Sequence, residues 1–139
     1  MKDVSFELPN APQIFQDEGQ VEIKMNLAQR VENLADGVHE VVLTVTVTAN
    51  LAEKTAYLAE VQQAGIFVIN GFNEQEMGGM LNSYCPNMLF PFAREVISDL
   101  VNKGSFPQML LAPINFDALY AQHLQAQTAK EDGEEQPVH

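Results

Sequence analysis

The side chains of this chain that could do chemistry are few and widely spaced. Cys85 is the single cysteine, so no disulfide can form within the chain, and as a nucleophile it would need a neighbouring base that the sequence does not place. His39, His123 and His139 lack the spacing of metal ligands. The GG pair at 78–79 lacks the following Lys and Ser or Thr of a phosphate loop. We therefore identify no catalytic residue and expect no metal and no cofactor.

The composition indicates one globular domain with an acidic surface. Of its 139 residues, 46% are hydrophobic, which is enough for one core. Nineteen acidic residues against seven basic ones give a net charge of −12, which disfavours nucleic acids and favours a basic partner. No apolar run approaches the roughly 20 residues of a membrane span, and no secretory signal opens the chain. We therefore expect a cytoplasmic protein that binds no nucleic acid and does not insert into membranes.

Alternating apolar and polar residues predict four strands. A short strand is expected at 4–8, followed by a proline-punctuated crossover and a strand at 21–27. The clearest alternation lies at 41–51, and a turn at NLAEK joins it to a strand at 55–67. The last two strands are therefore expected to pair as an antiparallel hairpin.

Two helices are expected after the strands. Pro86 suits a helix start and Gly104 a helix end, and the residues between them form an apolar arc that a small sheet does not fully cover. Asn115 can cap a second helix at 116–127. The polar, acidic residues at 128–139 are expected to form a disordered tail, so the folded domain is expected to span 1–127.

Leu58 is the unexpected residue of the strand at 55–67. Strict alternation places it on the same face as Lys54 and Glu60, among polar neighbours. Burying a leucine instead of exposing it is worth about 1.5 to 3 kcal/mol, so a contact for Leu58 is an attractive hypothesis. Single exposed apolar residues are nevertheless common on soluble proteins. From physics alone, an oligomeric binding protein and a small enzyme with unidentified catalytic groups both remain open.

Five motifs follow one another along the chain from Lys2 to about Leu124: KDVSFELPNAP, EVVLTVTVTANL, TAYLAEVQQAGIF, YCPNMLFPFARE and LAPINFDALY. In this order they closely resemble the SecB family of bacterial protein-export chaperones. The resemblance implies an α+β fold in which a four-stranded antiparallel sheet has helices packed on one side. It also implies a homotetramer assembled as a dimer of dimers.

The resemblance implies a function as well. SecB-like proteins hold newly made precursor proteins unfolded in the cytoplasm and pass them to the SecA translocation ATPase, and the missing phosphate loop agrees with holding that needs no ATP. A SecB-like chaperone of a toxin and antitoxin system would carry similar motifs and is the alternative. A small oligomeric enzyme with an apolar substrate groove is a further one. We expect a chaperone and not an enzyme.

Two sets of site residues carry over from the family by motif. The SecA-binding positions come from the first strand and from the strand that holds Leu58: Asp3, Glu7, Leu58 and Glu60. The client-binding groove of the family is bordered by the crossover and by the last helix, and its positions in this chain are Phe15, Met25, Leu27 and Tyr120. An acidic patch with one apolar anchor suits a basic partner.

Overall fold

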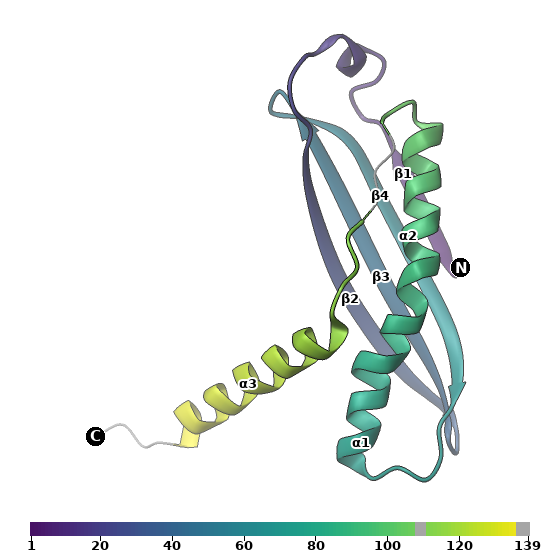
Figure 1. The fold of residues 1–139 in the computed structure, drawn as a ribbon, viewed down its shortest axis with the longest axis vertical. Helices are drawn as coiled ribbons and strands as arrows, with labels where there is room; N and C mark the ends of the chain where they lie inside the picture. The colour runs from purple at the N-terminus through teal and green to yellow at the C-terminus, as the bar shows by residue number, and fades with distance from the viewer. Residues whose placement is uncertain (108–110, 136–139) are drawn as a thin grey trace.

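The computed structural model describes residues 1–107 and 111–135, with side chains described as far as residue 127. Four strands form one antiparallel sheet in the order β1-β4-β3-β2, and helices lie on one side of it (Figure 1). The strands are β1 (Asp3–Glu7), β2 (Glu22–Ala35), β3 (Val38–Leu51) and β4 (Lys54–Val68). The predicted α+β class, with its four-stranded antiparallel sheet, is confirmed.

Strand β2 is much longer than its hydrophobic pattern. Its pairing with β3 runs from Glu22 opposite Asn50 to Ala35 opposite Val38, whereas the sequence predicted an end at residue 27. Most side chains from 28 to 35 are exposed, so they carry no apolar alternation that a sequence pattern could detect. The hydrogen bonds offered by the neighbouring strand, and not apolar burial, extend β2.

The turn between β3 and β4 has an unusual backbone for its residue types. Ala52 and Glu53 have φ of 52° and 63°, in the left-handed region. Two such residues form the tight hairpin turn whose twist matches that of the flanking strands, and Asn-Gly is its preferred sequence. Because alanine and glutamate have a Cβ, this conformation costs about 1 to 2 kcal/mol for each residue.

The crossover between β1 and β2 spans residues 8–21 and arches over one end of the sheet (Figure 1). Its short 3₁₀ helix η1 (Gln13–Gln16) buries Ile14 in the core. Asn10 Nδ2 donates a hydrogen bond of 2.9 Å to the carbonyl of Thr55 at the start of β4. The hydrogen bond of Asn10 and the burial of Ile14 therefore both hold the crossover against the sheet.

The first long helix begins earlier than the sequence predicted. Helix α1 (Glu74–Gly79) continues through a π-helical turn η2 (Met80–Tyr84) into α2 (Cys85–Lys103). Asn73 caps this start, because its side chain accepts a hydrogen bond of 2.8 Å from the Glu76 N–H. Helix α2 itself begins at Cys85 with Pro86 in its first turn, as the sequence predicted, but the sequence did not predict the helical turns of α1 and η2 that precede it.

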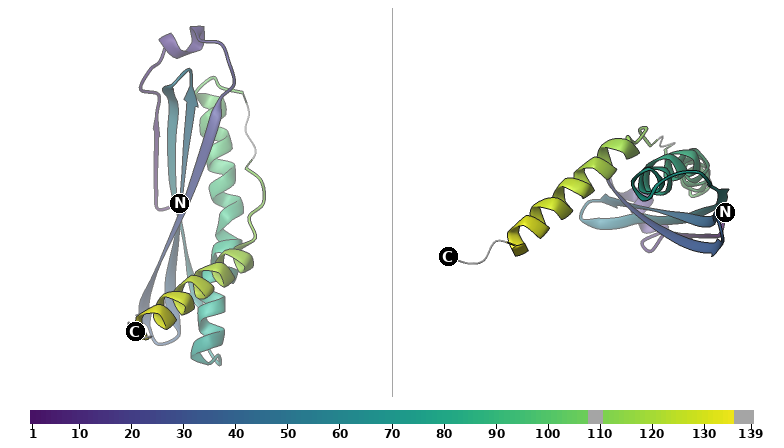
Figure 2. Two further views of the ribbon diagram at one scale, coloured as in Figure 1. Left: turned by 90° about the vertical axis from the view of Figure 1, so that its left-hand side faces the viewer. Right: turned by 90° about the horizontal axis from the view of Figure 1, so that it is seen from below.

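Helix α2 covers the sheet along β3 and β4 (Figure 2). Its inner face is buried and consists of Leu89, Phe90, Ala93, Ile97 and Val101. The outer face of α2, together with the end of η2, leaves Tyr84, Met88 and Phe92 exposed, and Phe92 keeps 59% of its accessible surface. The apolar arc expected from the sequence is thus wider than the sheet can cover, and one side of it faces outward.

Helix α3 (Phe116–Glu135) leaves the body of the protein and extends past the β2 edge of the sheet (Figures 1 and 2). It ends at Glu135, beyond the predicted helix end at about residue 127, and the disorder expected for residues 128–139 stays a prediction. Ala, Lys and Glu are good helix formers, and a helix that has already started adds such residues without tertiary contacts. The rest of the expected tail, 136–139, lies outside the described residues.

Candidate functional site

The strand register brings the four predicted SecA-binding residues onto one face of the sheet. Glu7 lies opposite Leu58, and Asp3 lies opposite Gln62, two positions beyond Glu60 on the same face. The residues between them on β4, Tyr57, Ala59 and Val61, point to the core under α2. We call Asp3, Glu7, Leu58 and Glu60 the acidic face, because they lie on the side of the sheet that the described helices leave open.

Leu58 lies outside the hydrophobic core. It is half-buried, and its cross-strand neighbours are Glu7 on β1 and Thr48 on β3. Glu60 is likewise half-buried and accepts a hydrogen bond of 3.4 Å from Thr46 Oγ1. Leu58 can therefore make a hydrophobic contact with a partner protein while the carboxylates around it attract basic side chains of that partner. The geometry therefore suits a basic partner surface with an apolar residue in it.

A second surface lies between β2 and α3, on the other side of the molecule. A cavity of about 750 Å³ is lined there by Met25 and Leu27 from the strand and by Tyr120 from the helix. Leu43 closes it from the core side, and we call it the groove. Three of the four predicted client-binding residues are thus brought together by the structure.

The groove also contains residues that sequence reasoning did not assign to it. These come from the edge strand β2, from η2 and from α3: Asn26, Ala28, Gln29, Asn82, Phe116, Leu119, His123, Leu124 and Gln127. Leu119, His123 and Leu124 share one helical stripe with Phe116 and Tyr120, which was visible in the sequence. The stripe indicated that this helix has an apolar face, but nothing in the sequence indicated that this face lies opposite β2.

Phe15 lies apart from the groove. It belongs to η1 in the crossover, remains 47% exposed, and places its ring centroid 5.0 Å from that of Phe106. The ring of Phe106 in turn packs at a tilt against that of Tyr57, with centroids 5.0 Å apart, and Tyr57 packs at a tilt against Phe6 at 6.0 Å. Phe15 is therefore the exposed end of an aromatic cluster beneath the crossover and does not line the cavity between β2 and α3.

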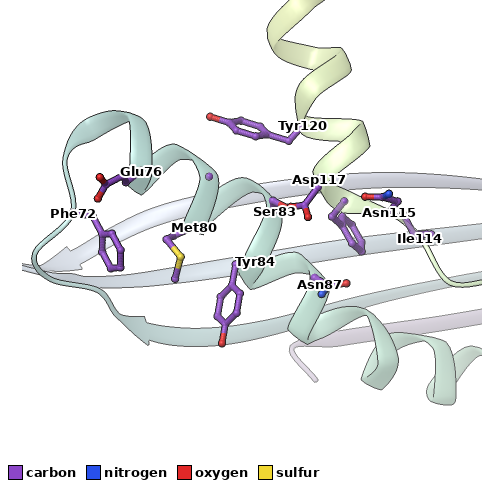
Figure 3. A pocket seen from close by; sticks show the side chains of 12 residues that line it. Phe72, Glu76, Met80, Ser83, Tyr84, Asn87, Ile114, Asn115, Asp117 and Tyr120 are labelled. Atoms are coloured by element: carbon purple, nitrogen blue, oxygen red, sulfur yellow. The ribbon is translucent and has the colours of Figure 1, made fainter.

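A third concave surface occurs where α3 meets the first long helix. This cavity of about 670 Å³ is lined by Phe72, Glu76, Met80 and Tyr84 on one side and by residues 114–117 and Tyr120 on the other (Figure 3). We call it the joint cavity. It shares Phe116 and Tyr120 with the groove, so the first turns of α3 separate the two cavities.

The candidate nucleophile is unsuited to chemistry. Cys85 is fully buried, and burial raises the pKa of its thiol from 9.0 to about 11. A thiol with such a pKa is almost entirely protonated at neutral pH, and the thiolate is the nucleophilic form. Among the side chains that the structure describes, those of residues 1–107 and 111–127, no three of His, Cys, Asp or Glu come together in a way that would hold a metal ion.

None of the helices in the described part of the chain is both long and apolar enough to cross a membrane. The helix with the longest apolar face, α2, instead buries that face on the sheet.

Comparisons with known proteins agree on one family. The family described as preprotein translocase subunit SecB matches residues 1–127. A protein-export protein SecB from Methylococcus capsulatus is 62% identical over 125 residues, covering 90% of this chain and 81% of that protein. A protein of the same name from Nitrosococcus oceani is 58% identical over 127 residues, covering 90% of this chain and 77% of that protein.

A solved structure shares the fold. It is the Mycobacterium tuberculosis SecB-like chaperone in complex with a peptide from the HigA1 antitoxin, which has a TM-score of 0.67 and 15% identity and covers 81% of this chain and 84% of that one. At this identity the likeness concerns the fold alone. Because the family match spans residues 1–127 and both export proteins are more than half identical, this chain belongs to the SecB family of protein-export chaperones.

Proposed function

We propose that this protein holds unfolded precursor proteins in the cytoplasm without ATP and delivers them to the SecA translocation ATPase. The observation that carries the proposal is the separation of two surfaces on one small domain. The groove between β2 and α3 suits an unfolded chain, and the acidic face suits a folded, basic partner. Because the two surfaces lie on opposite sides of the sheet, a client and SecA can be bound at the same time.

The groove offers two kinds of contact to an extended client. Met25, Leu27 and Tyr120 supply apolar pockets, and β2 is an edge strand whose outer backbone groups have no partner strand within the sheet. A client segment that adds to such an edge gains backbone hydrogen bonds, which depend little on its sequence. Coarse hydrophobicity and backbone pairing together explain how one groove can hold many precursors.

The exposed outer face of α2 supports assembly into a homotetramer, a dimer of dimers. Tyr84, Met88 and Phe92 are spaced four residues apart, so they form one apolar stripe along the helix. A stripe of this kind is costly in water and is covered when a second copy packs its own α2 against it in a symmetric interface. The open edge of β1 provides a second surface for pairing between copies.

We favour export over service to a toxin and antitoxin system. Both relatives at 58% and 62% identity are named for protein export, whereas the chaperone with the antitoxin peptide shares 15% identity. Binding without catalysis agrees with the protonated, buried Cys85. An antitoxin segment that bound far more tightly than any precursor would favour the alternative role.

A refolding experiment tests the proposal directly. A slow-folding precursor is diluted from denaturant into buffer with this protein at several-fold molar excess and without ATP. We expect folding to be delayed, because a protein that binds only the unfolded state lowers its free concentration. SecA added afterwards should take up the client complex. An unchanged refolding rate at every excess would count decisively against a chaperone.

A further inference from the structure

Helix α3 is held to the protein by its first turns. Phe116 is buried and packs edge-on against Phe90, with ring centroids 5.8 Å apart. The Asp117 carboxylate accepts a hydrogen bond from the Ser83 hydroxyl in η2. Asn115 Oδ1 accepts one of 3.0 Å from the Ala118 N–H, which caps the start of α3 itself. Beyond these turns the helix extends away from the body (Figure 2). The width of the groove is therefore set by the few contacts at this joint.

Tyr120 lies between the two cavities at the start of α3. Its side chain lines both the groove and the joint cavity, and it reaches from α3 toward α1 (Figure 3). The hydroxyl of Tyr120 lies against Gly78: a Cβ added at Gly78 would stand 2.6 Å from that oxygen and 3.7 Å from Cζ. The first distance is far below van der Waals contact, whereas the second is ordinary. Tyr120 can keep this position because residue 78 has no side chain.

The neighbouring glycine provides a contrast. A Cβ added at Gly79 would meet nothing within 4 Å. Each glycine inside a helix costs roughly 0.5 to 1 kcal/mol relative to alanine, so both residues weaken α1 to a similar extent. In the described structure, only Gly78 has a steric reason to be glycine, because only there would a Cβ meet a neighbouring side chain.

We infer that Gly78 is a positioning residue for the groove, acting through Tyr120. The inference rests on the proposed function, because the groove is the proposed client site. A side chain at residue 78 displaces the Tyr120 ring and with it the wall that separates the groove from the joint cavity. The ring is the end of a movable side chain, so the fold tolerates the displacement, while the shape of the groove changes.

The test compares four variants in the full-length protein: Gly78→Ala, Gly79→Ala, Tyr120→Phe and the double variant Gly78→Ala with Tyr120→Phe. The probe is a fluorescently labelled, reduced and carboxamidomethylated protein that cannot fold, and its Kd is measured by anisotropy. We expect Gly78→Ala to weaken binding by about fivefold or more, equal to about 1 kcal/mol, because the displaced Tyr120 ring changes the shape of the groove. Gly79→Ala should bind like the wild type. The double variant should bind like Tyr120→Phe, because removal of the hydroxyl removes the clash.

A second measurement does not depend on a client. Amide hydrogen exchange over residues 116–124 should be faster in Gly78→Ala, and wild-type-like in Gly79→Ala and in the double variant. Thermal unfolding should show that neither alanine lowers stability, since alanine favours the helix.

The outcomes separate the inference from the proposed function. If Gly78→Ala matches Gly79→Ala in hydrogen exchange, or if the double variant is not restored, Gly78 does not position Tyr120 and the inference is overturned. If the wild type fails to bind any unfolded probe while hydrogen exchange follows the expected pattern, the client function falls and the positioning role of Gly78 stands.

Discussion

Leu58 on β4 and Glu7 on β1 lie directly opposite each other on the face of the sheet that the described helices leave open. Residues opposite each other in an antiparallel pair have Cβ atoms only about 4.5 to 5.5 Å apart. A hydrophobic anchor and a carboxylate are therefore presented side by side, although they are far apart in the sequence and meet only through the register of the two strands.

The acidic face can be tested with two substitutions. Leu58→Arg removes the apolar anchor and adds repulsion toward a basic partner, and Glu60→Lys reverses a docking charge. We expect either change to weaken SecA binding by at least about tenfold, equal to about 1.4 kcal/mol, measured by calorimetry. The loss from Glu60→Lys should shrink with added salt, whereas the loss from Leu58→Arg should be less sensitive to it.

Glu32→Lys is the matched control for this experiment. Its charge change equals that of Glu60→Lys, and it lies on the same face of the sheet but on the far strand β2, opposite Glu40. Binding of SecA should be nearly unaffected by it, and all three variants should still delay folding of a client. Normal SecA binding by both Leu58→Arg and Glu60→Lys would show that the docking surface lies elsewhere.

A charge placed in the groove should weaken client binding and leave SecA binding intact. Leu27→Arg places a charge in the cavity between β2 and α3, so the affinity for unfolded chains should fall by about tenfold, while SecA binding persists. Ile23→Arg is the control, because Ile23 is an exposed residue on the same side of the same strand but does not line the cavity. Equal loss of client affinity in both variants would mean that added charge, and not its place in the groove, is responsible.

Phe15 provides a test of how far the client surface extends. It is exposed beneath the crossover and contacts Phe106, at a distance from the groove residues. If clients use both surfaces, Phe15→Ala should weaken the binding of long unfolded chains and leave short peptides that fill only the groove unaffected. A titration with labelled peptides of increasing length measures this dependence, and a loss that is equal at all lengths contradicts the two-surface arrangement.

The outer stripe of α2 predicts the state of assembly. Light scattering of the wild type should give four times the mass of one chain, and Phe92→Glu should lower that mass, because a carboxylate would be buried in the interface. Asn102→Glu adds the same charge to an exposed residue near the end of the helix and should leave the mass unchanged. A monomeric wild type across micromolar concentrations would refute the assembly.

Cys85 predicts a dependence of stability on alkaline pH. Because burial raises the pKa of its thiol from 9.0 to about 11, the folded state favours the protonated form, and this contribution to stability is complete below about pH 9. It should be lost as the pH rises from 9 through 11. Burial also raises the pKa of Tyr57 above 10.0, which acts in the same direction.

Urea unfolding from pH 8 to pH 11 separates the two contributions. The unfolding free energy of the wild type should fall more over this interval than that of Cys85→Ala. In the variant, Cys85 is gone and only the raised pKa of Tyr57 contributes. Alkylation of Cys85 at pH 8 should also be at least about a hundredfold slower than that of an unfolded cysteine, because the higher thiol pKa lowers the thiolate fraction by about that factor and burial keeps the reagent from the sulfur. Parallel stability curves for the two proteins would exclude a role for Cys85.

The β3 to β4 turn predicts a stabilising substitution. Glu53 has φ of 63°, so Glu53→Gly should remove backbone strain and raise the unfolding free energy by about 1 kcal/mol, measured in urea. Glu53→Ala removes the same charge but retains the Cβ, and it should give no such gain. A gain of equal size from both would assign the effect to the lost charge.

The sequence determined the local features of this protein. Alternation placed Leu58 and Glu60 on one face of β4, because successive side chains of any strand point to opposite faces. Helical periodicity placed Leu119, Tyr120 and His123 on one stripe for the same kind of reason. The acidic composition disfavoured nucleic acids as partners, while a binding protein and a small enzyme both remained open until the five motifs were compared with a family.

Tertiary structure decided which of these faces meet. The pairing of β1 with β4 brought Glu7 opposite Leu58 and Asp3 opposite Gln62, and the length of β2 came from hydrogen bonds to β3 and not from its own pattern. The helical turns before Pro86 contact the sheet through Gln29 on β2, whose Nε2 donates a hydrogen bond to the Asn82 carbonyl, a contact between residues far apart in the chain. Nothing in the GG pair at 78–79 distinguished its two residues, and only the place of Tyr120 against Gly78 does so. Each of these contacts joins residues distant in the chain, and a local pattern contains no information about which distant backbone or side chain will satisfy it.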